Sequence, residues 1–389
     1  MGEKVNITRE EYSGELTRQA MESLQEMQDQ ILLLLAARIE QIRKLTPEEL
    51  RSLAASAAVA KWISRDLALI RRAIEQQNRK YQPIIAGIIN SLEAENYEYM
   101  KPYLKYRKKQ ITREFFRSGM AKRIEIIHKE VLHDVLNVSH TYAYAYGGKV
   151  SPVGATYRRI VNKAITSASI GTASYDRVVK QAIDELAESG IKTVQWKDGK
   201  EKPLVRRADA HIRMNLMEGI NRVNAEMQKE AGKAFGADGV EISMHTLCAP
   251  DHQPVQGRQY SNEEYAALNA NLKRPIGTLN CRHIAFPIIM GISKPIHSEE
   301  ERIQAIQRSN SKVKYNGREM TRYDASQGQR RREREIRIMR SEAKAYEKAG
   351  LKADAAKINR EIKERIKEYH AYCNAVGMSE RMDRTRYYI

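Results

Sequence analysis

Residues 8–45 read TREEYSGELTRQAMESLQEMQDQILLLLAARIEQIRKL, and this stretch decides the fold. Thr8 and Glu11 have the spacing of a capping box, which marks the start of a helix. Apolar residues then recur in steps of three or four, at Leu16, Ala20, Leu24, Met27, Ile31, Leu35, Ile39 and Ile42. This period predicts one long helix with a narrow apolar stripe. Such a stripe favours packing in a bundle, and a self-associating coiled coil is the alternative.

The rest of the N-terminal third is also expected to be helical. Thr46-Pro-Glu-Glu49 combines a capping hydroxyl with a proline at the first helical position, which predicts a second helix running to about Asn78. Pro83 and Pro102 are expected to break the stretch that follows. A further helix is predicted over residues 120–140. Residues 1–149 are therefore interpreted as a helical N-terminal domain.

The middle of the chain has a different pattern. We expect helices, a β-hairpin and a strand here: helices at 156–168, 175–188 and 207–235, a hairpin from residue 192 around the turn 197–200, and a strand at 240–244. Residues 245–297 contain five of the ten prolines of the chain, at positions 250, 254, 275, 287 and 295. Prolines limit regular backbone hydrogen bonding, so residues 150–297 are predicted to form a loop-rich α+β unit.

The C-terminal segment, residues 298–389, is basic. Residues 311–389 contain 21 Lys and Arg against 12 Asp and Glu, a net charge of +9. Two helices are predicted at 327–346 and 351–372, separated by Gly350. The fold class expected is mainly α with a smaller α+β domain: long N-terminal helices, a central α+β unit and a helical basic C-terminal tail.

Composition excludes several classes of protein. Of the 389 residues, 42% are hydrophobic, which is too many for a wholly disordered chain. The most apolar run, residues 31–37, is far shorter than the roughly 20 residues of a membrane span, so we expect no membrane span. Three cysteines do not make a disulfide framework, which favours synthesis in a reducing cytoplasm. The net charge of +18 predicts an anionic neighbour, either nucleic acid or an acidic protein surface.

A cluster of metal-ligand residue types follows the predicted strand. The residues are His245, Cys248, His252, Cys281 and His283. Imidazole nitrogens and thiolates are the donors that zinc prefers, and four of them close a structural site. The candidate ligands are His245, His252, Cys281 and His283, with Cys248 as an alternative to His245. The spacing matches no standard zinc motif, so two further interpretations stay open: a hydrogen-bonded buried cluster, and a catalytic site with His252 as base.

Other catalytic signatures are missing from the sequence. There is no GxxxxGK[ST] phosphate loop, no GxSxG elbow and no HExxH helix. We therefore expect a protein that is not an enzyme. A metal-dependent nuclease or processing enzyme, using His245, His252, Cys281 and His283, is the alternative function.

The order of rare residues in the second half resembles the phage minor capsid protein 2 family, which is related to the head-morphogenesis proteins typified by phage Mu. The resemblance rests on the stretch 237–245, His252, Gln256-Gly-Arg258, Asn280-Cys-Arg-His283 and the stretch 287–292, and on the basic run 327–337. In this resemblance the motif positions are His245, His252, Gln256, Gly257, Cys281, Arg282 and His283. Cys248 departs from the pattern, which puts its use as a ligand in doubt.

The resemblance implies a structural protein of the virion, made in the cytoplasm of a bacterial host. It implies a few copies at the portal vertex that assist head morphogenesis and DNA packaging or ejection. The expected partners are the portal protein, the major capsid protein, packaged double-stranded DNA and other copies of the chain. Residues 1–149 would dock on the portal or capsid, and the basic segments would lie near DNA. The only cofactor suggested by the residues is a structural zinc ion.

Overall fold

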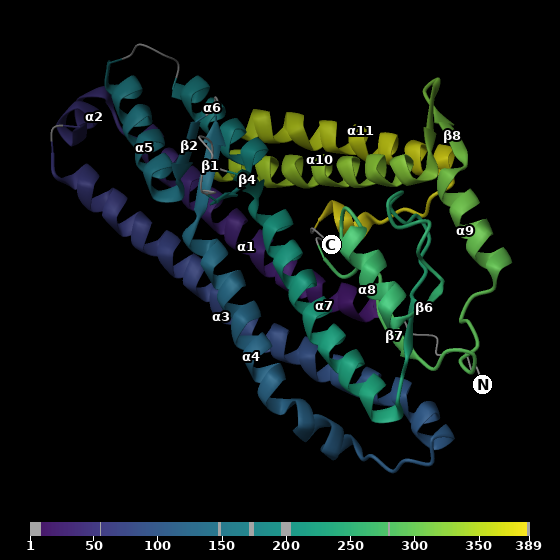
Figure 1. Cartoon of the computed structure of the whole chain (residues 1–389). Coiled ribbons are helices and arrows are strands. Elements are labelled where there is room, and N and C mark those ends of the chain that lie inside the picture. Colours follow the sequence, from purple (N-terminus) through teal and green to yellow (C-terminus); the bar gives the residue numbers. More distant parts are fainter. Residues whose placement is uncertain are drawn as a thin grey trace.

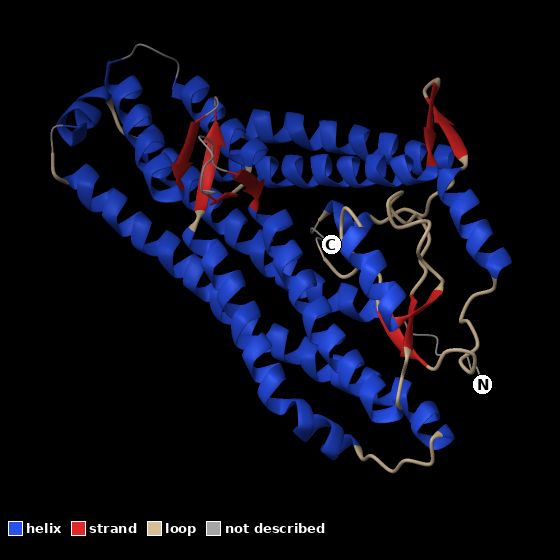
Figure 2. Cartoon of the chain, in the orientation of Figure 1, coloured by secondary structure: helices blue, strands red, loops and turns tan. Residues whose placement is uncertain are grey.

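The protein is described by a computed structural model that covers residues 9–54, 56–146, 149–170, 175–195, 204–278 and 281–386. Helices hold 70% of the described residues, and the remainder includes small antiparallel sheets, so the mainly α class with a smaller α+β portion is confirmed (Figure 2). The helices are α1 (Arg9–Arg43), α2 (Pro47–Ala54), α3 (Ala58–Tyr106), α4 (Arg113–His140), α5 (Val153–Ile170), α6 (Tyr175–Ser189), α7 (Ala208–Phe235), α8 (Asn262–Asn271), α9 (Glu299–Asn310), α10 (Arg322–Lys348) and α11 (Lys352–Val376).

Helix α1 is the long helix that the sequence predicts. All of its predicted stripe positions from Ala20 to Ile42 are buried. The stripe packs against α3, α7 and α10, and α4 lies along α3 and α7 (Figure 1). The apolar stripe of α1 therefore packs within a bundle of several other helices.

The prediction of one helix from residue 46 to residue 78 is wrong, because the chain forms two helices there. Helix α2 ends at Ala54 and α3 begins at Ala58. The Ser56 hydroxyl donates to the carbonyl of Leu53 and accepts from the backbone N–H of Ala58. These local bonds replace helical backbone bonds, which is how a serine interrupts a helix.

The prediction that Pro83 and Pro102 interrupt helical structure is also wrong, since both lie inside the 49-residue helix α3. Each proline is exposed, and so are Arg79 and Glu98, the residues whose carbonyls lose an intrahelical partner. Water can satisfy these carbonyls on the outer side of the helix. The opposite side of α3 is buried along its length, and this packing keeps the helix continuous past both prolines.

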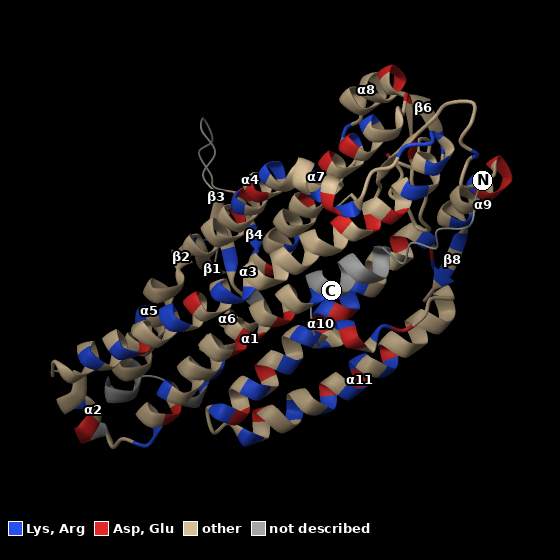
Figure 3. Ribbon diagram, turned by 90° about the horizontal axis from the view of Figure 1, so that it is seen from below, with Lys and Arg blue, Asp and Glu red and all other residues tan. Residues whose placement is uncertain are grey.

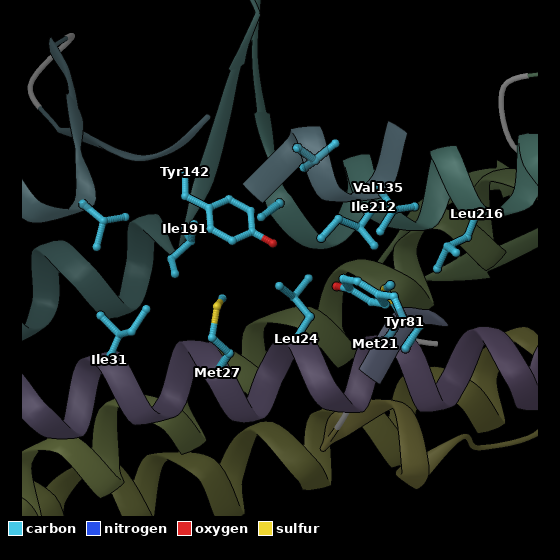
Figure 4. Packing of buried hydrophobic residues seen from close by; sticks show 14 of the residues in the cluster. Met21, Leu24, Met27, Ile31, Tyr81, Val135, Tyr142, Ile191, Ile212 and Leu216 are labelled. Carbon is cyan, nitrogen blue, oxygen red and sulfur yellow. The ribbon is translucent and has the colours of Figure 1, made fainter. Parts of the chain in front are cut away.

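One hydrophobic core draws on all three of the predicted domain ranges. It contains Leu24 of α1, Val135 of α4, Ile212 of α7 and Tyr346 of α10. Figure 4 shows Met21, Leu24, Met27 and Ile31 of α1 facing side chains from other helices and from the first sheet. The domain boundaries at 149/150 and 297/298 stay a prediction. Buried apolar side chains from all three ranges pack in the same core.

Within the described ranges, three small antiparallel sheets cover parts of this helical body. The first has the order β2-β1-β3-β4, formed by β1 (Tyr142–Tyr146), β2 (Lys149–Pro152), β3 (Lys192–Gln195) and β4 (Leu204–Arg207). Strands β3 and β4 pair as the predicted hairpin, whose turn at 197–200 lies outside the described residues. The second has the order β6-β5-β7, formed by β5 (Gly239–Ile242), β6 (Gln259–Ser261) and β7 (Ala285–Ile288), and it carries the candidate site. The third pairs β8 (Lys312–Tyr315) with β9 (Arg318–Thr321).

The two predicted C-terminal helices are confirmed as the hairpin α10–α11, which turns at Gly350 with φ of +76°. Tyr369 and Tyr372 of α11 are buried against α10, and the guanidinium of Arg332 lies 3.7 Å from the centre of the Tyr372 ring. The remaining element is the short 3-10 helix η1 (Met382–Thr385), which packs on α10. None of the described helices combines the length and apolar character that crossing a bilayer requires.

Candidate functional site

The second sheet positions the loops that hold the candidate ligands. Its central strand is β5 (Gly239–Ile242), paired with β6 (Gln259–Ser261) on one side and β7 (Ala285–Ile288) on the other. The backbone N–H of Ser243 donates to Ile284 at 2.8 Å, and that of Gly257 donates to Ile242 at 2.8 Å. These bonds extend the pairing beyond the strands, so the loop 243–258 and the segment 281–284 lie side by side.

Three of the four predicted ligands come together in the interior. His252, Cys281 and His283 are 2%, 5% and 2% exposed, and their ligand atoms all lie within 4.8 Å of one another. The fourth, His245, is half-buried, and its ring lies beside that of His283 with 4.3 Å between ring centres. The ligand atoms of His245, Cys248 and His283 form a second group of the same kind. The segment 281–284 has no regular secondary structure, and within it Cys281 Sγ lies 3.4 Å from Nδ1 of His283.

Each buried imidazole has one nitrogen facing Cys281 and the other facing a carbonyl oxygen. In His252, Nδ1 lies 3.5 Å from Cys281 Sγ, and Nε2 lies 2.7 Å from the backbone oxygen of Arg274. In His283, Nδ1 lies 3.4 Å from the same sulfur, and Nε2 lies 3.2 Å from Oε1 of Gln256. The Gln256 oxygen also accepts the backbone N–H of His245, which fixes the orientation of this amide.

The two thiols differ in their surroundings. Burial raises the pKa of the Cys281 thiol, but hydrogen bonds from His252 and from the backbone of Gly277 and His283 outweigh it, so the pKa is lowered overall. Burial, followed by the charges of Cys281 and Asp251, raises the pKa of Cys248 to about 12. The Cys248 thiol donates to the carbonyl of Ala249 at 3.3 Å. Cys281 is therefore the cysteine suited to act as a thiolate.

The two buried histidines also differ. Burial, together with the charges of His245 and His252, lowers the pKa of His283 to about 3, so this ring is neutral at pH 7. The hydrogen bond with Cys281 raises the pKa of His252 against the opposing effect of burial. The cluster therefore places a thiol of lowered pKa between one neutral imidazole and one of raised basicity.

A supporting ion pair lies outside the predicted set. Asp251 and Arg274 form a two-point ion pair, at 2.7 Å to Nε and 2.6 Å to Nη2. This pair holds in place the residue whose carbonyl accepts from His252. Arg274 is 22 positions from His252 and belongs to no motif, so only a view of the folded loops could have found it.

The motif residues have separate structural roles. Gln256 is fully buried and joins His245 to His283. Gly257 has a φ of +68°, a conformation that glycine adopts without steric cost. Arg282 is half-buried between the two ligand residues Cys281 and His283. Asn280, also part of the predicted motif, lies outside the described residues.

The sequence model of the phage minor capsid protein 2 family matches residues 10–374. The chain belongs to the phage minor capsid protein 2 family. The match covers nearly the whole chain and includes the α1 helix, the His/Cys cluster and both C-terminal helices, so it supports a structural role in the phage particle. No curated protein and no solved structure matches the chain.

Proposed function

We propose that this protein is a non-enzymatic minor component of the phage head, located at the portal vertex, where it assists head assembly and the passage of DNA. The observation that carries the proposal is the family match over residues 10–374. A capsid protein is held in the particle by contacts with other virion proteins. The proposed contacts are with the portal protein, the major capsid protein and packaged DNA.

The burial of the histidine cluster supports the non-enzymatic part of the proposal. His252 and His283 are each 2% exposed, and both nitrogens of each ring face protein atoms. A general base must reach the proton that it removes, within hydrogen-bond distance of a substrate. In this conformation neither ring offers a nitrogen to a bound substrate, which does not favour the nuclease alternative.

One face of α4 supports docking on the portal protein. Phe115 is 68% exposed and Ile126 is 50% exposed. They are 11 residues apart, which is close to three full helical turns, so both side chains lie on the same side of α4. The two side chains are roughly 16 Å apart along the helix, so a partner that covers both would lie along α4. We call Phe115 and Ile126 the outer α4 face and propose that the portal protein covers it.

Replacing the two apolar side chains of the outer α4 face tests whether the portal protein binds there. The full-length chain carrying Phe115→Ser and Ile126→Ser is compared with the unchanged chain for capture by purified portal protein. A control variant, Ile303→Ser, removes a similar apolar side chain, 42% exposed, from the separate helix α9. We expect the double variant to lose capture and the control to keep it. Equal capture by all three chains would reject docking through the outer α4 face.

Exposed arginines near the start of α10 support contact with DNA. Arg330, Arg331 and Arg334 are all exposed. In α11, by contrast, Arg365 pairs with Glu368 and Lys367 pairs with Glu364, both at 2.8 Å. Figure 3 shows both signs of charge interspersed along these two helices. Helix α10 has nine Lys and Arg against five Asp and Glu, whereas α11 has six against four. The excess of positive charge is therefore larger on α10, and we assign the DNA contact to its exposed arginines.

The salt dependence of DNA binding tests this assignment. We expect sequence-independent binding whose affinity falls steeply with salt, because each bound phosphate releases counterions. Replacing Arg330, Arg331 and Arg334 by glutamine should reduce the salt slope by about one for each of these arginines that binds a phosphate. Replacing Arg365 and Lys367 by glutamine serves as the matched control and should change the slope less. The same slope for both variants would contradict binding through α10.

A further inference from the structure

Three atoms meet in the cluster, namely His252 Nδ1, His283 Nδ1 and Cys281 Sγ. Too few hydrogens lie between them to give each a hydrogen-bond partner. The Nε2 atoms of His252 and His283 face carbonyl oxygens, which only accept, so each Nε2 carries a hydrogen. A neutral ring protonated on Nε2 has a lone pair on Nδ1. With both rings neutral, two Nδ1 lone pairs point at Cys281 Sγ, which has a single hydrogen to donate. With His252 charged and donating to a Cys281 thiolate, the Nδ1 lone pair of His283 still faces the sulfur. One buried nitrogen is therefore left against a sulfur lone pair, which is an unfavourable arrangement.

We propose that these three atoms bind a zinc ion, with His252 Nδ1, Cys281 Sγ and His283 Nδ1 as its protein ligands. A cation accepts all three lone pairs at once and removes the conflict. The choice of metal follows from the donors, since two imidazoles and one thiolate suit zinc, whereas magnesium and calcium prefer oxygen. Three protein ligands leave one tetrahedral position for a further ligand.

The distances agree with such a site. Zinc lies about 2.0–2.1 Å from imidazole nitrogen and about 2.3 Å from thiolate sulfur, so tetrahedral angles place the two donors roughly 3.5 Å apart. The observed separations are 3.5 Å from Cys281 Sγ to His252 Nδ1 and 3.4 Å from Cys281 Sγ to His283 Nδ1. Both sulfur–nitrogen separations therefore match those of a bound zinc ion, and the three ligand atoms all lie within 4.8 Å of one another.

The second ring nitrogens of His252 and His283 make the hydrogen bonds that are usual for metal-bound histidines. Metal-bound histidines donate their second N–H to an oxygen, which fixes the tautomer and the ring orientation. His252 does so to Arg274, itself held by Asp251, and His283 does so to Gln256. The backbone N–H of His283 points at Cys281 Sγ at 3.4 Å, a contact that stabilises a thiolate.

The second group, His245, Cys248 and His283, is less suited to bind the ion. Cys248 lies 3.5 Å from Nε2 of His283, on the opposite side of the ring from Cys281. Its own hydrogen is directed at the Ala249 carbonyl. His245 is partly exposed and approaches His283 ring to ring. The structure therefore assigns the metal to Cys281, with Cys248 and His245 as neighbours that do not bind it.

The proposed ion would connect two loops that have little regular structure. His252 belongs to the loop after β5, and Cys281 and His283 belong to the segment before β7. A structural zinc stabilises such regions because the ligands are held together only in the folded state. This role is independent of the location in the phage head, so the site and the proposed function can fail separately.

Metal analysis of the full-length protein tests the proposal. The protein is purified without chelator, and its zinc content is measured beside that of Cys281→Ser and Cys248→Ser. We expect about one zinc per chain in the unchanged protein and in Cys248→Ser, and only background zinc in Cys281→Ser. The two cysteines are both buried, so this pair separates ligation from general damage to the fold.

A spectroscopic measurement covers the case in which Cys281→Ser fails to fold. Cobalt(II) is added to the unchanged protein after zinc removal, and the near-ultraviolet absorption is recorded. Cobalt bound through Cys281 should give a thiolate charge-transfer band of single-thiolate intensity, unchanged in Cys248→Ser. A protein with no zinc and no such band would overturn the site, and loss of the band in Cys248→Ser would overturn the ligand assignment.

Discussion

Arg38 of α1 and Asp66 of α3 form a two-point ion pair inside the helical body, with Nε 2.7 Å from Oδ2 and Nη2 2.8 Å from Oδ1. Asp66 is 2% exposed. Tyr157 of α5 donates its hydroxyl hydrogen to the same carboxylate. Three helices that are distant in sequence are therefore joined at one buried charge, which specifies how α1, α3 and α5 pack.

Asp66→Ala should destabilise the protein strongly. It leaves the Arg38 guanidinium, whose side chain is 11% exposed, without its partner, and breaking a buried pair costs about 3–5 kcal/mol. The control is Glu98→Ala, which removes an exposed ion pair with Lys101 and should cost less than about 1 kcal/mol. Urea unfolding of both variants measures the difference. Equal losses would show that the buried pair has no special role.

Gly219→Ala should also destabilise the protein, through steric overlap. A Cβ atom at this position of α7 would lie 2.5 Å from Cγ2 of Val131 in α4. Overpacking of this kind costs roughly 1–3 kcal/mol. Gly119→Ala is the matched control, since a Cβ there meets nothing within 4 Å, and alanine should stabilise α4 by roughly 0.5–1 kcal/mol. Thermal unfolding should move in opposite directions for the two variants.

Tyr369→Phe should weaken the C-terminal hairpin. The Tyr369 hydroxyl donates to Glu333 at 3.0 Å and accepts from the side chain of Gln329 at 3.2 Å and the backbone N–H of Arg381 at 2.8 Å. Phenylalanine leaves these groups without that partner, at a cost of about 1–3 kcal/mol for each one that stays buried. Tyr106→Phe, at a position 43% exposed, is the control. If both variants unfold at the same urea concentration, the hydroxyl contributes nothing.

The free energy of unfolding should fall as the pH rises from about 4.5 to about 7, because Glu342 loses its proton in this range. Burial, together with the hydrogen bond and charge of Asp184, raises the pKa of Glu342 to about 7 from its ordinary value of 4.5. The folded protein therefore holds this proton more tightly than the unfolded chain does, and the stability that it contributes is lost between about pH 4.5 and pH 7.

Glu342→Gln removes this titration, and melting temperatures at pH 5 and pH 8 test it. The variant should lose less stability than the unchanged protein between these two values, because glutamine stays neutral at both. Titrating groups that do not interact with Glu342 are common to the two proteins, so their contributions cancel in the comparison. The same loss in both proteins would contradict the raised pKa of Glu342.

The sequence predicts those parts of the fold in which a local pattern agrees with the packing. The apolar period of residues 16–42 predicts α1 and its buried stripe, and Gly350 predicts the turn between the last two helices. The prolines of α3 mislead because the cost of proline depends on which side of a helix it lies. That side is set by the tertiary contacts of α3, which a local pattern does not contain.

The candidate site shows the same limit. The residue types single out His245, Cys248, His252, Cys281 and His283, since imidazole nitrogens and thiolates are the donors that zinc prefers. Their geometry depends on the pairing of β5 with β6 and β7, on the Asp251–Arg274 ion pair and on the Gln256 amide. These are long-range contacts between loops, so the spacing of the ligands along the chain did not reveal them.

The central claim, that this chain is a structural part of the phage head, is tested most directly by examining assembled particles. Purified mature heads and their precursors are analysed by quantitative mass spectrometry and electron cryomicroscopy. The account predicts that the chain is present in a few copies for each head, with density for its long α1–α3–α4–α7 bundle at the portal vertex. Absence of the chain from both mature heads and precursors would contradict the account.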